Sequence, residues 1–393
     1  MTLDLARLRT ETPGVAHRVH LDNAGASPMP TPVLDAMTAY LRRESEIGGY
    51  EAATELAARL DGVYDSIARL VGGARDEIAL TENATVAWQM AFYALATTFK
   101  PGDRILTARA EYAANYVAFL QVARRTGAVV EVVPDDADGA LDPQALERMI
   151  DGRVRLIAIT WVPTNGGLVN PAAAVGRVAR AHGIPYLLDA CQAAGQMPVD
   201  VEALGCDLLS ATGRKFLRGP RGSGFLYARR DLMRRLEPAM IDHFAAPWVA
   251  PDRYELRPDA RRFESWENNY AARLGLGVAV DYALEIGIEA IAVRCQALAG
   301  QLRRSLSGIA GVTVHDLGRH PAAIVGFSLD GREAGPVKAH LAGLGIGVGS
   351  SQPSSTLLDA TARALPTLVR ASPHAFNTEE EIETLAAAIR ALR

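Results

Sequence analysis

The sequence predicts an α/β protein with a large domain built on a mostly parallel sheet and a smaller α+β domain near its C-terminus. Short apolar segments alternate with segments of helical period between residues 77 and 189, as in parallel strands joined by helices. The 393 residues are too many for one compact core. We expect an N-terminal arm that packs with the small domain (residues 1–30), a large domain (31–265), and a linking helix with the small domain (266–393).

Composition is that of an ordinary globular protein. Hydrophobic residues make up 49%, charged residues 22%, and the net charge is −4, so no nucleic acid or anionic membrane is indicated as a partner. Three cysteines without paired spacing indicate neither a disulfide framework nor a zinc site, and no metal is expected. The first residues lack the apolar run of a signal peptide, and no apolar segment approaches the ~20 residues of a membrane span. We expect a cytoplasmic protein.

Two helices are predicted before the alternating region. Residues 1–20 should form a polar arm, and His20–Pro30 a short extended segment. Apolar residues at helical spacing predict a helix over Thr31–Glu46. Gly48–Tyr50 should end it, and an apolar stripe predicts a second helix over Ala52–Gly72.

The alternating region should supply most of the sheet. Its expected strands are Glu77–Leu80, Arg104–Ala108, Ala128–Val133, Leu156–Trp161 and Ile184–Asp189. Its expected helices are Val86–Thr97, Asn115–Thr126, Pro143–Ile150 and Pro171–His182. Ligands of such sheets collect beyond the carboxyl ends of the strands. We therefore expect one site to gather the polar features that follow these ends, namely Asp189, Glu111, Thr164 and the turn Glu82–Thr85.

The C-terminal part is less regular. Pro247–Trp266 is expected to be an irregular connection. The elements expected after it are a helix over Ala271–Ile286, strands over Val312–His315 and Ile324–Leu329, and a last helix over Thr378–Leu392. Thr378 and Glu381 have the spacing of a capping box at the start of that helix.

The segment 189–227 carries the residues best suited to chemistry. Lys215 follows Thr212 and precedes a glycine-rich stretch. A lone lysine is usually a surface charge, but the other cations of this chain are nearly all arginines, which cannot form a Schiff base. Asp189 ends an apolar strand, although it could also be a helix N-cap. An amine, an acid and a small hydroxyl ahead of glycines are what a pyridoxal-phosphate (PLP) site needs.

Other positions have both a structural and a functional interpretation. The turn Glu82–Thr85 exposes backbone N–H groups at a helix start, which suits a phosphate, although many helices begin this way. Arg370 follows an apolar run and could form a surface ion pair or bind a substrate carboxylate. His374 has a similar ambiguity and is interpreted as structural.

Taken together, these motifs resemble the class V aminotransferase family, whose members share the type I PLP-dependent fold of aspartate aminotransferase. The similar segments span nearly the whole chain: LDNAGASPMP, TENATVAW, AEYAAN, ITWVPTNGGLVNP, the block 189–227, RFESWENN and LVRASPHAFNTEEEI. Within the family, GGYEAA, AEY, RKFLRGPRG and SPHAFNTEEE look similar to isopenicillin N epimerase-like and hercynylcysteine sulfoxide lyase-like proteins.

The resemblance implies a role for each matched residue. Lys215 would bind PLP as a Schiff base and act as the catalytic base, Asp189 would pair with the ring nitrogen, and Gln192 would lie near the ring hydroxyl. The other implied cofactor contacts are Ala84, Thr85 and Thr212 to the phosphate, Tyr112 stacked on the ring, Thr164, Arg214, and Trp266 from the neighbouring subunit of a homodimer. The implied substrate contacts are Arg370, which would bind the carboxylate, and Tyr50.

Two departures separate the chain from the cysteine desulfurase branch. That branch has a stacking histidine where this chain has Tyr112. It also has a nucleophilic cysteine on the loop that matches GVGSSQPSSTLLD, where this chain has Ser350, Ser351, Ser354 and Ser355. Cys191 lies beside Asp189 at a buried strand end and is not expected to replace that cysteine.

The resemblance thus implies a PLP enzyme acting on a small amino-acid substrate. The first hypothesis for its reaction is β-elimination from an S-substituted cysteine. The shared residues equally allow an aminotransferase or an amino-acid epimerase. A non-catalytic binding protein that kept the fold is the alternative from another class.

Overall fold

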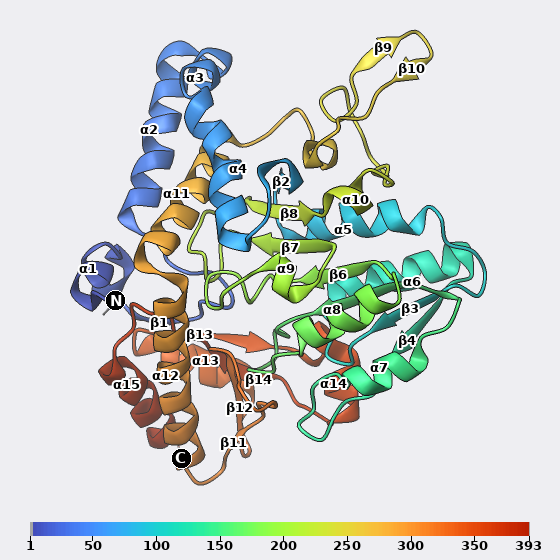
Figure 1. Cartoon of the computed structure of the whole chain (residues 1–393). Helices are drawn as coiled ribbons and strands as arrows, with labels where there is room; N and C mark the ends of the chain where they lie inside the picture. Colours follow the sequence, from blue (N-terminus) through green and yellow to red (C-terminus); the bar gives the residue numbers. More distant parts are fainter. Residues whose placement is uncertain (1–2, 393) are drawn as a thin grey trace.

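Two main sheets, a small two-stranded sheet and the helices around them form the protein, whose computed structural model describes residues 3–392 (Figure 1). The larger sheet has seven strands in the order β2-β8-β7-β6-β5-β3-β4. Their bounds are β2 (Ile78–Thr81), β3 (Arg104–Thr107), β4 (Val129–Val132), β5 (Val154–Thr160), β6 (Tyr186–Asp189), β7 (Leu208–Thr212) and β8 (Gly224–Ala228). Only β8 runs antiparallel to its neighbours. The expected mostly parallel sheet is confirmed.

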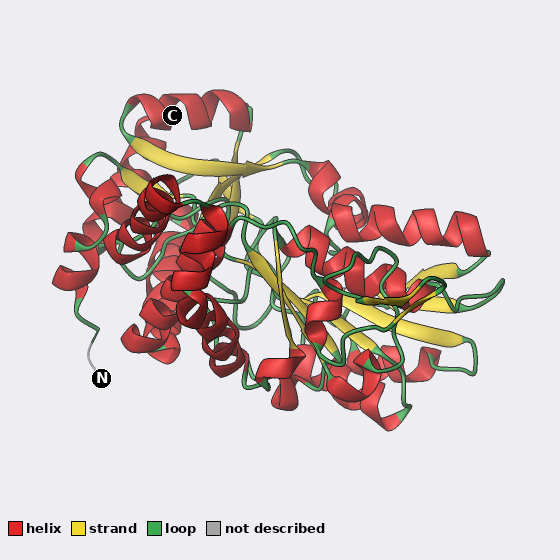
Figure 2. Ribbon diagram, turned by 90° about the horizontal axis from the view of Figure 1, so that it is seen from above, coloured by secondary structure: helices red, strands yellow, loops and turns green. Residues whose placement is uncertain are grey.

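Helices cover both faces of this sheet (Figure 2). They are α5 (Ala84–Ala96), α6 (Ala113–Thr126), α7 (Pro143–Met149), α8 (Ala172–Ala181), α9 (Val201–Leu204) and α10 (Arg230–Met233). Successive strand residues point to opposite faces, so Leu187 packs in one apolar cluster with Trp88 of α5, whereas Leu188 packs in the other with Val175 of α8. Burial on both faces explains why central strands such as β6 are largely apolar.

The smaller sheet has five strands in the order β1-β13-β14-β12-β11. Their bounds are β1 (Val19–Leu21), β11 (Val312–Val314), β12 (Val325–Leu329), β13 (Ile346–Ser351) and β14 (Leu368–Ala371). The helices of this part are α11 (Tyr270–Ile286), α12 (Ile288–Ser307), α13 (Ala334–Gly343), α14 (Leu357–Ala362) and α15 (Glu379–Ala391). Strand β1 is parallel to β13, so the N-terminal arm supplies an edge strand of this sheet. The domain boundaries at residues 30 and 265 stay a prediction.

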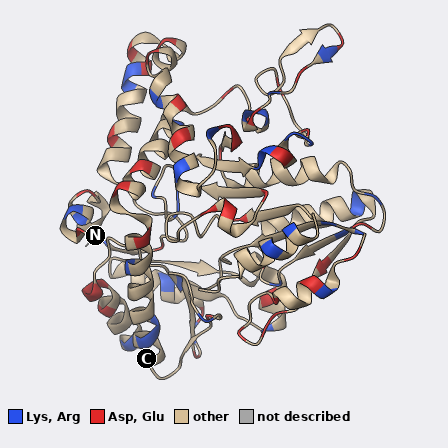
Figure 3. Ribbon diagram, in the orientation of Figure 1, with Lys and Arg blue, Asp and Glu red and all other residues tan. Residues whose placement is uncertain are grey.

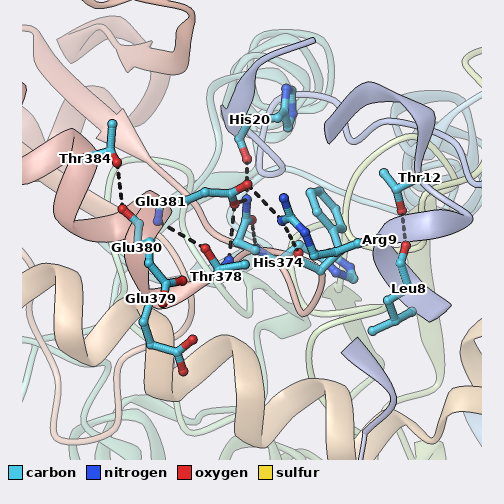
Figure 4. A network of polar contacts seen from close by, with 12 residues as sticks. Leu8, Arg9, Thr12, His20, His374, Thr378, Glu379, Glu380, Glu381 and Thr384 are labelled. Atoms are coloured by element: carbon cyan, nitrogen blue, oxygen red, sulfur yellow. Dashed lines mark hydrogen bonds and ion pairs between the residues drawn. The ribbon is translucent and has the colours of Figure 1, made fainter. Parts of the chain in front are cut away.

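Polar contacts fix the arm to the start of α15 (Figure 4). Thr378 Oγ1 accepts from Glu381 N at 3.2 Å, and Glu381 Oε2 accepts from Thr378 N at 3.2 Å. The expected capping box is thus confirmed. Glu381 also pairs with Arg9 at 2.8 Å, and Asn377 Nδ2 donates to the His20 carbonyl at 3.1 Å. The capping residue of the last helix therefore also holds the beginning of the chain.

The structure corrects several expected elements. The arm is partly helical, because α1 covers Leu5–Thr10. Helix α2 (Thr31–Ile47) ends at Gly48, and Gly49 and Tyr50 already belong to the next helix. The expected second helix is divided at Leu56 into α3 (Gly49–Glu55) and α4 (Ala57–Val71). The connection after Pro247 contains a hairpin of β9 (Trp248–Ala250) and β10 (Arg253–Tyr254), which projects from the body in Figure 1. Helices α12 and α13 and strand β13 were not expected.

Charges of both signs are interspersed over the helices (Figure 3). Within residues 3–392, no helix is long and apolar enough to cross a membrane. The same residues place no group of three or more His, Cys, Asp or Glu side chains where they could hold a metal ion.

Two helical glycines should respond oppositely to replacement by alanine. A Cβ at Gly176 of α8 would lie 2.0 Å from the Leu204 carbonyl oxygen, whereas a Cβ at Gly62 of α4 would meet nothing within 4 Å. We expect Gly176→Ala to destabilise the fold by roughly 1–3 kcal/mol through overpacking. Gly62→Ala should stabilise it by about 0.5–1 kcal/mol, because alanine favours a helix more than glycine does. Urea unfolding measures both, and equal effects of the two changes would contradict this packing.

Candidate active site

A cavity of about 530 Å³ lies beyond the carboxyl ends of the large sheet. Seven of the residues selected from the sequence line it: Ala84, Thr85, Tyr112, Asp189, Thr212, Arg214 and Lys215. They come from distant parts of the chain and meet because β6 and β7 are neighbours and α5 begins beside β8. The expected convergence is observed for Asp189 and the turn Glu82–Thr85, whereas Glu111 and Thr164 do not line this cavity.

Lys215 lies in a tight loop between β7 and β8. The loop is closed by backbone hydrogen bonds from Gly213 N to Ser223 O at 3.0 Å and from Gly219 N to Gly213 O at 2.8 Å. Lys215 is only 9% exposed, which excludes the interpretation as a surface charge. A lysine held at the wall of a cavity can present its amine to a bound group with little loss of side-chain entropy.

Arg218 helps to fix this loop in a strained conformation. Its φ of 60° is unusual for a residue other than glycine. The buried guanidinium donates to Thr12 Oγ1 at 2.6 Å and to the Pro28 carbonyl at 3.1 Å, and it lies 4.7 Å from the centre of the Phe376 ring. Thr12 and Pro28 of the N-terminal arm therefore bind the Lys215 loop through Arg218.

The start of α5 offers hydrogen-bond donors to the cavity. Asn83 caps the helix by accepting from Val86 N at 3.0 Å, while the N–H groups of Ala84 and Thr85 have no carbonyl to bind within the helix. A Cβ at Gly224 would lie 2.8 Å from the Asn83 backbone, so the missing side chain lets the helix start approach β8. The Thr212 hydroxyl donates to the Ser223 carbonyl at 3.2 Å and retains its capacity to accept.

Asp189 is part of a buried network with Asn115 and Glu111, which we call the Glu111–Asn115–Asp189 network. Asn115 Nδ2 donates to Asp189 Oδ2 at 2.9 Å and to Glu111 Oε1 at 2.8 Å. Burial raises the pKa of Asp189, opposed by the hydrogen bonds from Asn115 and Cys191 N and by the charge of Lys215. Burial also raises the pKa of Glu111, to about 7, against hydrogen bonds from Thr160 and Asn115. Asp189 accepts from Cys191 N rather than capping a helix.

The segment 22–27 contacts Gln192 and Arg214, and sequence reasoning missed these contacts. Gln192 Nε2 donates to the Ala24 carbonyl at 3.1 Å, and Ser27 N donates to the Arg214 carbonyl at 2.8 Å. The Arg214 guanidinium donates in turn to the Gly25 carbonyl. The motif LDNAGASPMP was noted in the sequence, but nothing in it indicated contacts with residues near 192 and 214.

Arg370 and Thr164 also meet at this segment. Arg370, 7% exposed, donates through Nη1 to Thr164 Oγ1 at 2.7 Å and pairs through Nη2 with Asp22 at 3.0 Å. Its Nε is buried without a partner. The alternative of a surface ion pair is therefore wrong, since the arginine is buried and retains one free donor.

Comparison with known proteins identifies the family. The model of the class V aminotransferases matches residues 19–385. The chain belongs to the class V aminotransferase family. A probable cysteine desulfurase of Methanothermobacter thermautotrophicus is 30% identical over 384 residues, which cover 96% of this chain and 95% of that protein.

Solved structures agree with the family. The cysteine desulfurase of Thermococcus onnurineus NA1 matches with a TM-score of 0.92 at 27% identity, covering 100% of this chain and 98% of that one. A lysine-to-alanine mutant of C-DES, with glycine covalently linked to its PLP cofactor, matches with a TM-score of 0.87 at 23% identity and covers 97% of this chain and 98% of that one; it supports the fold alone. This class V chain is a PLP-dependent enzyme. The expected family is confirmed by the match over residues 19–385, and the narrower subgroup expected from the motifs stays a prediction.

The residues around the cavity fit PLP. The amine of Lys215 and the carboxylate of Asp189 face one cavity. Gln192 Oε1 is buried without a hydrogen-bond partner, as an acceptor for a ring hydroxyl should be in its absence. The N-terminus of α5 suits a phosphate. The individual roles of these residues stay predictions.

Five predicted contacts are not among the residues that line the Lys215 cavity of the same chain: Thr164, Gln192, Arg370, Tyr50 and Trp266. Tyr50 and Trp266 are 73% and 43% exposed. They line a neighbouring cavity of about 640 Å³, which shares Glu82 with the first. A role for either residue therefore depends on substrate or on a second chain at this boundary.

The three cysteines differ in their access to the cavity. Cys206 and Cys295 are fully buried, and burial raises the pKa of each to about 12. Cys191 is half-buried, lines the cavity and contacts Lys215. Its N–H donates to Asp189 Oδ1 at 2.9 Å, so its backbone is fixed beside the strand end. Cys191 was expected to be buried at the strand end; the structure shows instead that it is half-buried and lines the cavity.

His374 supports the Lys215 loop from the side of the small sheet. Its Nε2 contacts the Phe216 carbonyl at 2.9 Å, and Nδ1 accepts from Ala375 N at 2.8 Å. The neutral ring, protonated on Nε2, satisfies both contacts. Burial lowers the pKa of His374 to about 3, and the charge of Arg218 adds to this effect. These contacts fit the structural interpretation.

We expect His374→Gln to reduce the loss of stability in acid. The unfolded histidine takes up a proton below about pH 6.5, whereas the folded one stays neutral to about pH 3. The unfolded state thus binds more protons, and stability falls as the pH decreases through this interval. Wild-type protein should lose about 2 kcal/mol through this residue between pH 6.5 and 5. Urea unfolding at both pH values should show a smaller loss for the variant, while the exposed control His182→Gln keeps the wild-type loss. Identical losses for all three proteins would refute the assignment.

Proposed function

We propose that this chain is a carbon–sulfur β-lyase that acts on an S-substituted cysteine. Membership of a PLP-dependent family supports chemistry at the α-carbon of an amino acid. A relative 30% identical over nearly the whole chain carries the name probable cysteine desulfurase, which supports a cysteine-like substrate.

The observation that carries the choice of reaction concerns the enzyme's own thiols. The loop that bears a nucleophilic cysteine in the desulfurase branch is here partly strand β13, whose Ser350 and Ser351 pair with Val369 and Leu368 of β14. Cys191 alone of the three cysteines lines the cavity, and its backbone is fixed. Without a thiol on a mobile loop, sulfur has no enzyme acceptor, so it should leave with its own substituent.

The proposed roles follow from the positions of the side chains. PLP, when bound, supplies an electron sink for the pair left at Cα after loss of a proton. Lys215 binds the cofactor and, once the substrate amine has displaced it, removes the Cα proton as a general base. Asp189 pairs with the ring nitrogen, and Gln192 accepts from the ring hydroxyl. Tyr112 packs on the ring.

The remaining proposed contacts orient the two anionic ends. The N–H groups of Ala84 and Thr85 and the Thr212 hydroxyl bind the phosphate, with Arg214 beside them. Arg370, positioned by Thr164 and Asp22, uses its free Nε to bind the substrate carboxylate. Departure of the β-sulfur group with its electron pair, followed by hydrolysis, gives pyruvate, ammonia and a thiol.

A product assay tests this reaction. Holoenzyme incubated with S-substituted cysteines should release pyruvate and ammonia in equal amounts with no keto acid added. Lys215→Ala should lower the rate by at least about 10³-fold, because it removes both the covalent anchor and the base. Formation of the pyridoxamine form without pyruvate would indicate an aminotransferase, and exchange of the Cα proton without products would indicate an epimerase. A persulfide on Cys191, detected by mass spectrometry after incubation with L-cysteine, would instead favour desulfurase chemistry.

We further propose a homodimer in which Trp266 reaches the cofactor of the neighbouring subunit. Its exposure and its position outside the Lys215 cavity of its own chain support this arrangement. Trp266→Ala and Lys215→Ala proteins should each have impaired activity. Their co-expressed heterodimer, purified through two different affinity tags, should regain activity, because one of its two sites keeps both residues intact.

The control heterodimer combines Lys215→Ala with Asp189→Asn. Both changes affect the cavity of the chain that carries them, so each of its two sites contains one defect and activity should stay low. A heterodimer of Trp266→Ala and Lys215→Ala no more active than this control would contradict the shared site.

A further inference from the structure

Two residues of the Glu111–Asn115–Asp189 network, Glu111 and Asn115, have no part in the proposed catalytic roles. Glu111, Asn115 and Asp189 are 3%, 2% and 5% exposed. Glu111 has no cationic partner among its hydrogen-bond donors. Burying a carboxyl group without a cation is costly, so the surroundings of Glu111 should explain why it is there.

Five hydrogen bonds converge on the Glu111 carboxyl group. The donors are Thr107 Oγ1 at 3.1 Å, Tyr112 N at 3.1 Å, Asn115 Nδ2 at 2.8 Å, Thr160 N at 2.8 Å and Thr160 Oγ1 at 2.5 Å. Both oxygens therefore face at least one N–H group. An ionised carboxylate only accepts, whereas an amide of the same size would turn an NH₂ group toward one of these N–H donors. The site is built for a carboxylate.

Glu111 also determines how the Asn115 amide is oriented. Asn115 Nδ2 lies between two carboxyl groups and gives one hydrogen to each. If the amide were reversed, its oxygen would face both Glu111 Oε1 and Asp189 Oδ2. Two acceptors would then oppose each other at each contact, so the observed orientation is the only one that satisfies both acids in their ionised form.

We propose that Glu111 is a positioning residue that, through Asn115, keeps Asp189 ionised and directed at the nitrogen of the PLP ring. With the amide donating, Asp189 Oδ2 is held as an anion and Oδ1 is held by Cys191 N. With the amide reversed, Asp189 would need a proton of its own to face the amide oxygen, and it would lose its charge toward the ring. This inference rests on the proposed pairing of Asp189 with the cofactor.

A purely structural role for Glu111 makes a different prediction. Glu111 lies one residue before Tyr112, the N-cap of α6, where a negative charge stabilises a helix. Its loss would then lower the stability of the fold without changing the protonation of the cofactor. The distinction therefore needs a measurement at the ring nitrogen itself.

The ¹⁵N chemical shift of PLP labelled in its ring nitrogen provides that measurement on the holoenzyme. Wild-type protein should give the shift of a protonated ring, and Glu111→Gln should move it toward the unprotonated position. The dissociation constant for PLP should rise about tenfold, because a charge-assisted contact is weakened. Asn115→Leu should have the same two effects. The double variant should be no worse than Asn115→Leu, since Glu111 acts through Asn115.

Two further variants make each outcome decisive. Glu264→Gln removes another buried carboxyl group, 3% exposed, which pairs with Arg273 at 2.9 Å and accepts from Tyr64 and Leu80 N rather than from the network. This change should leave the ¹⁵N shift at the wild-type position. Asp189→Asn should move the shift whether or not Glu111 contributes. If it does not, the proposed role of Asp189 fails, and the inference fails with it. If Asp189→Asn moves the shift but Glu111→Gln and Asn115→Leu do not, only the role of Glu111 is overturned.

Discussion

The placement of a buried carboxylate at the end of β6 is the constraint on which the site depends. An ionised acid inside a protein costs several kcal/mol unless donors or a cation compensate it. Asp189 has both, because Asn115 and Cys191 N donate to it and Lys215 lies across the same cavity. The parallel register places Asp189 beside Thr160, whose N–H and hydroxyl donate to Glu111. The fold thus places the Asp189 carboxylate where a positively charged ring nitrogen would stabilise it.

The arm that precedes the large sheet completes the site from the opposite side. Strand β1 belongs to the small sheet, and the residues just after it reach Gln192, Arg214 and Arg370. A shift of the small sheet against the large one would therefore move Arg370 together with the backbone groups that contact Gln192 and Arg214. The Arg218 contacts with Thr12 and the Pro28 carbonyl extend this coupling to the Lys215 loop. A change in the packing of the N-terminal arm should therefore also change the positions of Gln192, Arg214 and the Lys215 loop.

Local pattern predicted the elements more fully than it predicted the contacts. Helices α5 and α6 were expected to within two residues at each end, because caps and apolar period act within a few residues. Helix α12 was missed, although Ile288, Ile291, Cys295 and Leu298 form its buried stripe, since Gly287 marked the end of α11. Asn115 belongs to a motif noted in the sequence, but its contact with Asp189 spans 74 residues. Such a contact depends on the strand order, which local spacing does not encode.

The residues that would decide the type of reaction lie around the proposed PLP site. Burial raises the pKa of Tyr112, so the phenol that stands in place of the branch's histidine stays protonated and uncharged near neutral pH. It can donate a hydrogen bond, but it cannot carry a proton back and forth at that pH as an imidazole can. Serines replace the acceptor cysteine, and Cys191 is fixed beside Asp189. Among the described residues, those that line the cavity include no imidazole, and their one thiol belongs to Cys191, whose backbone N–H is bound to Asp189. Under the proposed function, the sulfur therefore leaves Cβ together with the substituent that it already carries, as a thiol, and no sulfur atom is transferred to the enzyme.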